Sequence, residues 1–202
     1  MSNNSNRNVL IGIVGIPILV IVLSSVLYFL VNSKSVDLGT VNNGTLVQPP
    51  LALAEQSIFK LSGERFDYSK PEPKWAFVVF AGEQCDEECA PMLYTARQSI
   101  TALGKRMGRV RLIYVTTTAT ISEQLQTQFD TEYRGMDVVV MDSAALVAFF
   151  ADSDIDPLNG KQFFVADPRG WLMMQYQVEQ SDQDSLNVLG KAVVRDMKRL
   201  IK

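Results

Sequence analysis

The pattern of apolar and polar positions divides the chain into four parts. Residues 1–8 are polar, and residues 9–31 form a run of twenty-three residues without a charge. Residues 32–56 carry Asn, Ser, Gly and a pair of prolines and show no sustained period. From residue 57 to residue 202, short apolar runs alternate with helical periods. The pattern predicts a disordered N-terminus, a transmembrane helix, a linker and one folded domain, in that order.

The uncharged run over residues 9–31 is long enough to cross a membrane. As an α-helix it would span roughly 34 Å, against about 30 Å for the hydrocarbon core of a bilayer. A cleavable signal peptide is the alternative, but its apolar region is usually about 7–15 residues and ends at a small-x-small site, which residues 31–36 lack. We therefore expect a permanent anchor. Arg7 before the run and Lys34 after it give only a weak charge signal for its orientation.

Residues 57–202 alternate between strand and helix patterns. Runs of β-branched and aromatic residues predict strands over 58–61, 65–68, 75–81, 110–115, 137–141, 162–166 and 171–177. Helices are predicted over 91–107, 121–133, 144–150 and 184–201. The first two strands and the last two strands should form hairpins, the latter joined by the turn Asp167-Pro-Arg-Gly170. The order predicts an α/β domain in which helices cover both faces of a mixed sheet.

Both cysteines of the chain fall in one loop, between the strand over 75–81 and the helix that follows. Cys85 and Cys89 are spaced as Cys-x3-Cys. The free amide groups and the dipole at the start of a helix favour thiolate over thiol. A bond between the two would close too short a loop to stabilise the fold greatly, so it would serve chemistry rather than folding. The spacing indicates a redox pair or a metal site, the alternative being two inert thiols.

Charge and composition narrow the classes of function. After residue 34 the chain has 17 Lys and Arg against 22 Asp and Glu. This balance argues against nucleic-acid binding, which needs basic patches, and against a domain that lies flat on anionic lipid. The chain has no histidine, no glycine-rich phosphate loop and no second cysteine pair. These absences exclude a Ser-His or Cys-His nucleophile of the usual kind and a structural zinc site.

The cysteine loop resembles that of a known family. The sequence Phe80-Ala-Gly-Glu-Gln-Cys85-Asp-Glu-Glu-Cys89-Ala-Pro91 is similar to the Phe-Gly-aromatic-Thr-x-Cys-Pro-Asp-x-Cys-Pro motif of the SCO/SenC proteins, which bind copper and help to assemble cytochrome c oxidase. Both cysteines match and Glu87 stands where the family has Asp, but neither proline is in register. The turn at residues 167–170 and the single anchor also match, and the resemblance runs from about Ile58 to the C-terminus. It implies a thioredoxin-like fold with a redox-active, copper-binding pair at Cys85 and Cys89.

The resemblance also implies a histidine as third copper ligand, nine residues before the proline of that turn. Asn159 holds this position. A Cys2His site for Cu(II) therefore cannot be built, although two thiolates remain good ligands for Cu(I). Methionines are possible third donors, but such residues more often pack in a core; they are Met92, Met173 and Met174. The acidic residues between the cysteines should attract a cation and disfavour thiolate, or are ordinary solvated acids at a helix start; they are Asp86, Glu87 and Glu88.

Three functions fit these residues. We favour a membrane-anchored assembly factor for a respiratory oxidase, which handles Cu(I) or adjusts the redox state of a partner's copper-site thiols and is a metallochaperone rather than an enzyme. Its partner would be an oxidase subunit or another copper or thiol protein, and its domain would lie in the periplasm outside a bacterial inner membrane, or in the mitochondrial equivalent. The alternatives are a general membrane-tethered thiol–disulfide oxidoreductase and a non-catalytic accessory protein. The missing histidine weakens the first function and the acidic spacer weakens the second.

Overall fold

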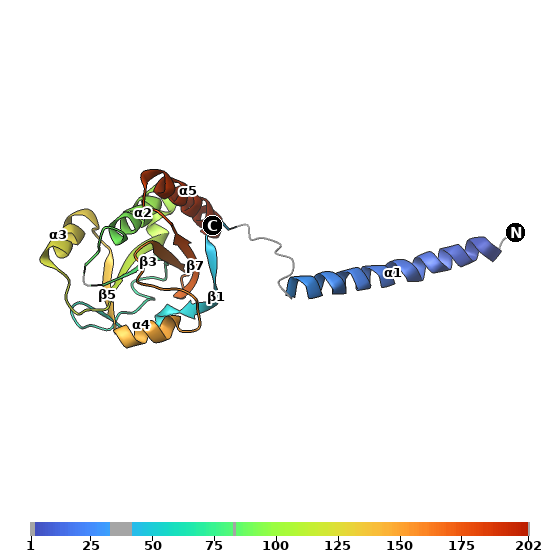
Figure 1. The fold of residues 1–202 in the computed structure, drawn as a ribbon, viewed down its shortest axis with the longest axis horizontal. Coiled ribbons are helices and arrows are strands. Elements are labelled where there is room, and N and C mark those ends of the chain that lie inside the picture. Colours follow the sequence, from blue (N-terminus) through green and yellow to red (C-terminus); the bar gives the residue numbers. More distant parts are fainter. Residues whose placement is uncertain (1–2, 33–41, 83, 202) are drawn as a thin grey trace. The chain divides into compact units, whose positions relative to one another are not determined.

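The computed structural model describes residues 3–32, 42–82 and 84–201, which divide into two compact units. The first unit contains one helix, α1 (Asn3–Asn32), and the second is the domain from Asn42 onward (Figure 1). Most of the N-terminal half of the predicted linker, residues 33–41, lies outside the described residues.

Helix α1 is longer than the apolar run that predicted it. It begins at Asn3, within the eight residues predicted to be disordered, because each residue added to an existing helix gains a backbone hydrogen bond. Its segment Ile11–Leu30 is long and apolar enough to cross a membrane. The large apolar side chains of this segment are exposed on every side of the helix, from Ile11 to Phe29. A helix that is apolar all round is suited to lipid rather than to the surface of a globular domain.

Seven strands of the domain form one mixed sheet in the order β1-β7-β6-β3-β4-β5-β2. The strands are β1 (Thr45–Ala52), β2 (Ile58–Lys60), β3 (Trp75–Ala81), β4 (Val110–Thr116), β5 (Asp137–Met141), β6 (Gln162–Ala166) and β7 (Trp171–Gln177). Strands β3, β4 and β5 are parallel to one another. Strands β6, β7 and β1 follow beyond β3, each antiparallel to its neighbour, and β2 pairs antiparallel with β5 on the other side. Strand β3, which leads into the cysteine loop, therefore lies at the centre of the sheet.

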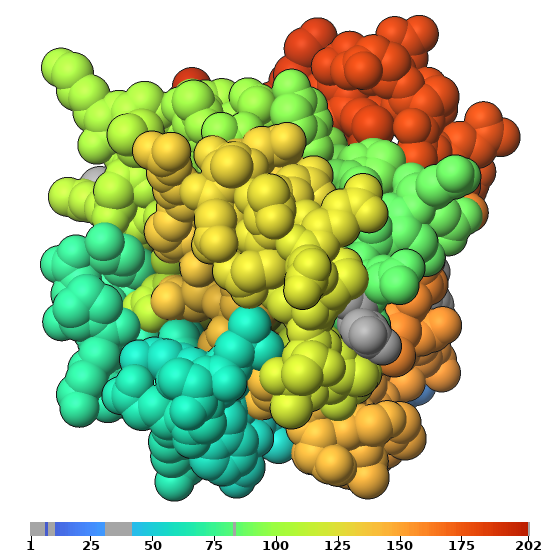
Figure 2. All heavy atoms as spheres, turned by 90° about the vertical axis from the view of Figure 1, so that its left-hand side faces the viewer, coloured from blue at the N-terminus to red at the C-terminus, as the bar shows by residue number. Residues whose placement is uncertain are grey.

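Helices cover both faces of the sheet, as the sequence predicted. They are α2 (Cys89–Ala102), α3 (Glu123–Glu132), α4 (Ser143–Phe150) and α5 (Gln183–Leu200), with a 3-10 helix, η2 (Gly104–Arg109), after α2. Alternate residues of β3 enter two different cores, because side chains of a strand point to opposite faces. One core joins Phe77 and Val79 to α2, α3 and α5, and the other joins Val78 and Phe80 to α4. In Figure 2, α5 (red) and α4 (orange) accordingly lie at opposite sides of the domain.

Strand β1 lies in the segment that the sequence predicted to be a linker over residues 32–56. It pairs with β7 along one edge of the sheet, and a short 3-10 helix, η1 (Leu53–Glu55), follows it. The pairing register is interrupted between Leu46 and Leu51, where the exposed Pro49 and Pro50 lie. A proline pair suggests a loop, but an edge strand tolerates it because the N–H groups on its outer side need no partner. The ordered domain thus begins earlier than the predicted residue 57.

Two further predicted elements differ in detail. The predicted hairpin over 58–68 is only partly formed, because β2 pairs with the edge of β5 and the second strand contributes a single bridge, Phe59 to Arg65. The helix predicted over 91–107 begins at Cys89 and tightens into η2 after Ala102. Pro91 fits the first turn of α2, where its missing N–H would have no partner within the helix.

Candidate functional site

Cys85 and Cys89 are joined by a disulfide just beyond the C-terminal end of β3. Cys89 is the first residue of α2 and is only 2% exposed, whereas Cys85 is partly exposed in the loop before the helix. Thiol–disulfide exchange requires a thiolate to reach one sulfur while the other departs. The difference in exposure makes Cys85 the sulfur that an incoming thiolate can reach and Cys89 the leaving group.

Asp86 fixes the start of α2. Its Oδ1 atom accepts hydrogen bonds from the N–H groups of Glu88 (3.1 Å) and Cys89 (2.9 Å), and its carbonyl accepts one from Ala90 (3.0 Å). The first N–H groups of a helix have no partner within it, so a carboxylate at this place stabilises the helix start. The carboxylate that the sequence suggested as an attractor for a cation is therefore engaged with the backbone. These bonds hold the loop independently of the disulfide.

Two buried hydroxyl groups of β4 hold the other end of the loop. The hydroxyls of Tyr114 and Thr116 each donate to the carbonyl oxygen of Gly82, both at 3.2 Å. Burial raises the pKa of Tyr114 well above its ordinary value, and the negative charge of Asp86 raises it further. Tyr114 therefore stays a neutral donor across the physiological pH range. Sequence reasoning missed both residues, although parallel pairing of the two strands aligns Thr116 with Ala81, next to Gly82.

The loop over residues 151–160 passes directly against the cysteine loop. Gly160 has a left-handed backbone (φ +73°), and a Cβ atom there would lie 3.1 Å from the Glu88 Cβ atom and 3.4 Å from the Cys89 nitrogen. The next residue, Lys161, places its Nζ atom 2.9 Å from Glu88 Oε1. Figure 2 shows the green surface around residue 90 adjoining the orange surface of this loop. Exposed ion pairs of this kind contribute little stability, so the close approach of the glycine backbone defines the contact.

Asn159, the residue at the position of the family's histidine, lies beside this contact. Its side chain is exposed, and its Oδ1 atom accepts a hydrogen bond from the backbone nitrogen of Lys161 at 3.0 Å. It thus shapes the turn rather than pointing a donor at the sulfurs. Among the described residues, no group of three or more His, Cys, Asp and Glu side chains could hold a metal ion. The side chains present fit no three-ligand copper site of the Cys2His kind.

Two of the three methionines proposed as sulfur donors lie away from the cysteines. Met174 pairs with Val165 of β6, which in turn pairs with Phe77 of β3. Phe77 is four residues before the end of β3, which corresponds to roughly 13 Å of strand. Met173 and Met174 therefore lie near the middle of the sheet and not at its cysteine end. Met92 is close to Cys89 in sequence but is fully buried among the core residues of α2, so all three methionines are part of the packing.

Comparison with known proteins identifies the domain. A family model described as a transmembrane-like, thioredoxin-like C-terminal domain matches residues 75–202, from the first residue of β3 to the end of the chain. The chain belongs to this family. No curated protein sequence matches it.

Solved structures with this thioredoxin-like fold include several SCO proteins. A SCO1/SenC family lipoprotein from Bacillus anthracis is 19% identical, with a TM-score of 0.53, and the match covers 77% of this chain and 99% of that one. Yeast Sco1 with copper bound is 12% identical (TM-score 0.53; 79% and 95% covered). The apo Sco1 protein from Thermus thermophilus is 18% identical (TM-score 0.52; 80% and 99% covered). At these identities the similarity establishes the fold, and it confirms the thioredoxin-like, SCO/SenC-like architecture expected from the cysteine motif.

Proposed function

We propose that this thioredoxin-like chain is a membrane-anchored assembly factor for a respiratory oxidase that exchanges electrons with the thiols of a partner protein. The observation that carries the proposal is the unequal exposure of the two sulfurs in one disulfide, with Cys85 accessible and Cys89 2% exposed. The SCO-like fold and the loop packed beside the pair support the choice of partner, a subunit whose own copper ligands include a pair of thiols.

The exchange is a reversible two-electron reaction. A thiolate of the partner attacks Cys85 Sγ, the bond between the two cysteines breaks, and Cys89 leaves as a thiolate that takes up a proton. The second thiol of the partner loses its proton and attacks the mixed disulfide, which releases Cys85 as a thiolate. The partner's dithiol is then oxidised to a disulfide, and Cys85 and Cys89 are reduced. In the opposite direction, the dithiol form of this chain reduces a disulfide of the partner.

Helix α1 supplies the anchor in this proposal. Its segment Ile11–Leu30 would cross a bacterial inner membrane once, with the domain in the periplasm, or the inner membrane of a mitochondrion in the equivalent orientation. Disulfides persist on the oxidising side of such membranes, which supports that orientation.

The reduced pair offers a second candidate function, the transfer of Cu(I) as cargo. The two sulfurs lie close enough to share one ion, and Cu(I) accepts two thiolate ligands. This function needs no histidine, but it requires the disulfide to open first. An anaerobic titration of the reduced protein against a Cu(I) chelator should show one ion per chain, and it should show none for Cys85→Ser.

A trapping experiment tests the main proposal. Cys89→Ser leaves Cys85 able to form a mixed disulfide that nothing within the chain resolves, whereas Cys85→Ser leaves only a buried sulfur. Each variant is first treated with a small aromatic disulfide, which activates an accessible thiol as a mixed disulfide. It is then mixed with a copper-site subunit in which Ser replaces one of the two copper-ligand thiols, so that the partner cannot resolve the adduct, and with an unrelated protein that carries one exposed thiol. We expect a covalent adduct between Cys89→Ser and the oxidase subunit only. Equal trapping of both proteins would indicate a general oxidoreductase, and no adduct with either would reject exchange.

A further inference from the structure

The charge of the domain is divided unevenly along the chain. Of the 17 Lys and Arg after residue 34, ten lie in residues 90–122 and 185–202, and the only acidic residue in those two segments is Asp196. Asp196 is 1% exposed and lies 3.9 Å from Arg199 Nη1, so one cation offsets its charge. The remaining segments contain seven basic and 21 acidic residues. Seven of the ten basic residues in the first two segments lie on η2 and α5, so the net negative charge conceals one basic face.

This basic face is formed by η2 and the last two-thirds of α5. Arg106 of η2 donates from Nη1 to the carbonyl oxygen of Lys198 at 2.9 Å, which joins the two elements. Exposed cationic side chains on them include Lys105, Lys191, Arg195 and Lys198. Met107, between the basic residues of η2, is 53% exposed. An apolar side chain among cations is a feature of surfaces that bind at a membrane interface.

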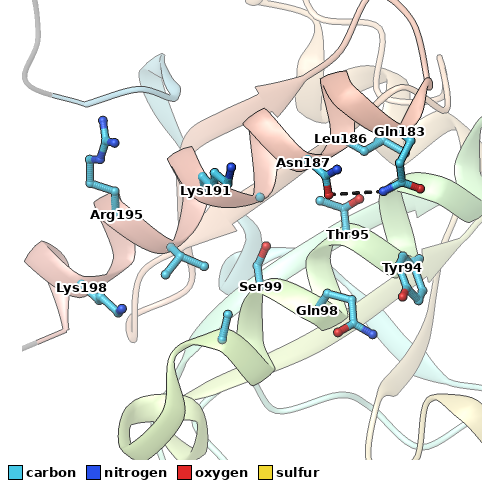
Figure 3. Close-up of a pocket in the computed structure, with 13 residues that line it drawn as sticks. Tyr94, Thr95, Gln98, Ser99, Gln183, Leu186, Asn187, Lys191, Arg195 and Lys198 are labelled. Atoms are coloured by element: carbon cyan, nitrogen blue, oxygen red, sulfur yellow. Dashed lines mark hydrogen bonds between the residues drawn. The ribbon is translucent and has the colours of Figure 1, made fainter.

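A groove between α2 and α5 runs along this face. Its volume is about 760 Å³, and Lys191, Arg195 and Lys198 form part of its α5 wall. Figure 3 shows Ser99 pointing from α2 towards α5 at the middle of the groove. Ser99 is 2% exposed, and its hydroxyl oxygen has no hydrogen-bond partner in the described structure. A buried hydroxyl without a partner, in a groove that three cationic residues also line, is suited to an anionic, hydrogen-bonding group such as a phosphate ester.

The start of the domain is fastened to the same helix. The backbone nitrogens of Asn43 and Gly44 donate to Asp196 Oδ2 at 2.7 Å and 3.1 Å, and Asn43 Nδ2 donates to Oδ1 at 2.7 Å. Asp196 lies on α5, between Arg195 and Lys198 in sequence. Ten peptide links join the end of α1 at Asn32 to Asn42, and a chain of that length reaches roughly 35 Å at most. If α1 spans the bilayer, this tether keeps Asn42 within that distance of the end of the helix.

We propose that η2 and α5 form a docking surface for anionic phospholipid headgroups of the membrane that α1 crosses, with the groove between α2 and α5 receiving one headgroup phosphate. The inference rests on the anchor described under the proposed function. Docking would hold the basic face on the bilayer even though the domain as a whole is negative, because the local charge near the surface decides the interaction within a Debye length of about 10 Å. Each Lys or Arg near an anionic surface strengthens binding about fivefold.

Docking would also orient the cysteine pair. The end of α5 (Leu200 and Ile201) and η2 (Arg109) line one pocket together with Trp75, the first residue of β3. The cysteines follow the last residue of the same strand, roughly 20 Å away along β3. A domain docked through its basic face would present the disulfide away from the bilayer.

Lysine footprinting of the full chain in lipid nanodiscs tests this surface. The rates at which an amine-specific reagent labels each lysine are compared in discs of phosphatidylcholine alone and in discs that also contain phosphatidylglycerol. We expect Lys105 and Lys198 to be labelled several-fold more slowly in the anionic discs, and Lys60 and Lys161 to be unchanged. High salt should remove the difference.

A charge-removing variant and a matched control sharpen the test. Lys191→Gln combined with Arg195→Gln should weaken docking roughly 25-fold, by about fivefold for each cation removed, and so abolish the protection of Lys105 and Lys198. Lys60→Gln combined with Arg134→Gln changes the net charge equally on a different side of the domain, and it should leave the protection intact. If both variants lose protection equally, net charge rather than this face controls the interaction and the proposal fails.

The remaining outcomes separate the lipid surface from other occupants and from a failure of the anchor. Protection that glycerol phosphate produces in neutral discs would indicate a site for a soluble phosphate and overturn the docking proposal. Equal labelling of Lys105 and Lys198 in neutral and anionic discs would overturn it as well, and would leave an acidic protein as the partner of this face. A chain that fails to enter any disc would instead refute the anchor and, with it, membrane docking, whereas the thiol-trapping experiment would be unaffected.

Discussion

The two ends of strand β3 differ in both charge and chemistry. Its C-terminal end leads into the disulfide, next to three acidic residues and a loop that contains Asp152, Asp154 and Asp156. Its N-terminal end lies beside the basic residues of η2 and the end of α5. One end has a reactive bond and few cations, and the other has many cations and no reactive group. Under the two proposals above, redox chemistry and membrane attachment would use separate ends of the same sheet.

The largest change to the difference between the two ends of β3 would be a copper site at the C-terminal end, beside the cysteines. Asn159→His places an imidazole in the segment whose neighbour, Gly160, contacts the cysteine loop. After reduction, we expect this variant to bind Cu(II) with a thiolate absorption band, which the unchanged chain should lack. Asp154→His, on the same loop but further from Gly160, is the control and should show no such band. The absence of a band for Asn159→His would mean that this position cannot reach the sulfurs.

Substitutions on the buried side of α5 should lower the stability of the domain, whereas substitutions on its exposed side should leave the stability almost unchanged. Asp196→Asn removes a buried carboxylate that accepts hydrogen bonds from Asn43, Gly44 and the Tyr176 hydroxyl. We expect a loss of about 3 kcal/mol in unfolding free energy and a melting temperature about 6–12 °C lower. Lys191→Gln with Arg195→Gln, on the exposed side, should change stability by less than about 0.5 kcal/mol. A similar loss for both variants in thermal unfolding would show that the basic side chains also serve folding.

Reduction of the disulfide should lower the unfolding free energy by less than the Asp196→Asn substitution does. The bond closes a loop of five residues, for which chain entropy predicts a contribution of about 2 kcal/mol. Because Asp86 and Tyr114 hold the loop through their own hydrogen bonds, we expect the reduced protein to melt about 4–8 °C lower and still cooperatively. Thermal unfolding with and without reductant measures this. A drop well above 10 °C would make the pair structural rather than redox-active.

The smallest expected effect is a loss of stability at alkaline pH that depends on Tyr114. Burial raises the pKa of Tyr114 above its ordinary value of about 10, so the unfolded chain loses this proton before the folded chain does. The stabilising effect is complete below about pH 10 and declines as the pH rises further, by about 1.4 kcal/mol per pH unit. Tyr114→Phe should remove that part of the slope in urea unfolding measured between about pH 9 and pH 11. An unchanged slope would show that this hydroxyl is not protected from ionisation.

The sequence predicted the parts of the fold that depend on local pattern. Strand β3 and the amphipathic helix α5 lie where the hydrophobic pattern predicted them, and the turn at residues 167–170 lies where Pro168 and Gly170 predicted it. Strand β1 was missed because its stability comes from pairing with β7, about 125 residues later, and its prolines conceal the strand pattern. The cysteines were found by spacing alone. Tyr114, Thr116 and Lys161 were not, because their positions near the cysteines follow from sheet register and not from their neighbours in the sequence.

The full extent of the basic face could not be predicted from the sequence for a related reason. The total charge of the chain argued against contact with anionic lipid, and that argument averages over the whole surface. Its basic residues come from two segments about 80 residues apart, which become one surface only when α5 packs beside α2 and η2. Net charge describes solubility and long-range repulsion, whereas recognition depends on which charges share a face.

The prolines of β1 affect whether copies of the chain could associate through the edges of their sheets. If α1 anchors the chain, copies in one membrane would meet often and in similar orientations. An unpaired edge strand of a sheet can pair with the same edge strand of a neighbouring copy. Pro49 and Pro50 lack the N–H groups that such an addition would use, and they lie exposed in the edge strand where the pairing register is already broken. At the opposite edge, β2 is only three residues long. Both borders of the sheet are thus poor templates for the addition of a strand from a second copy.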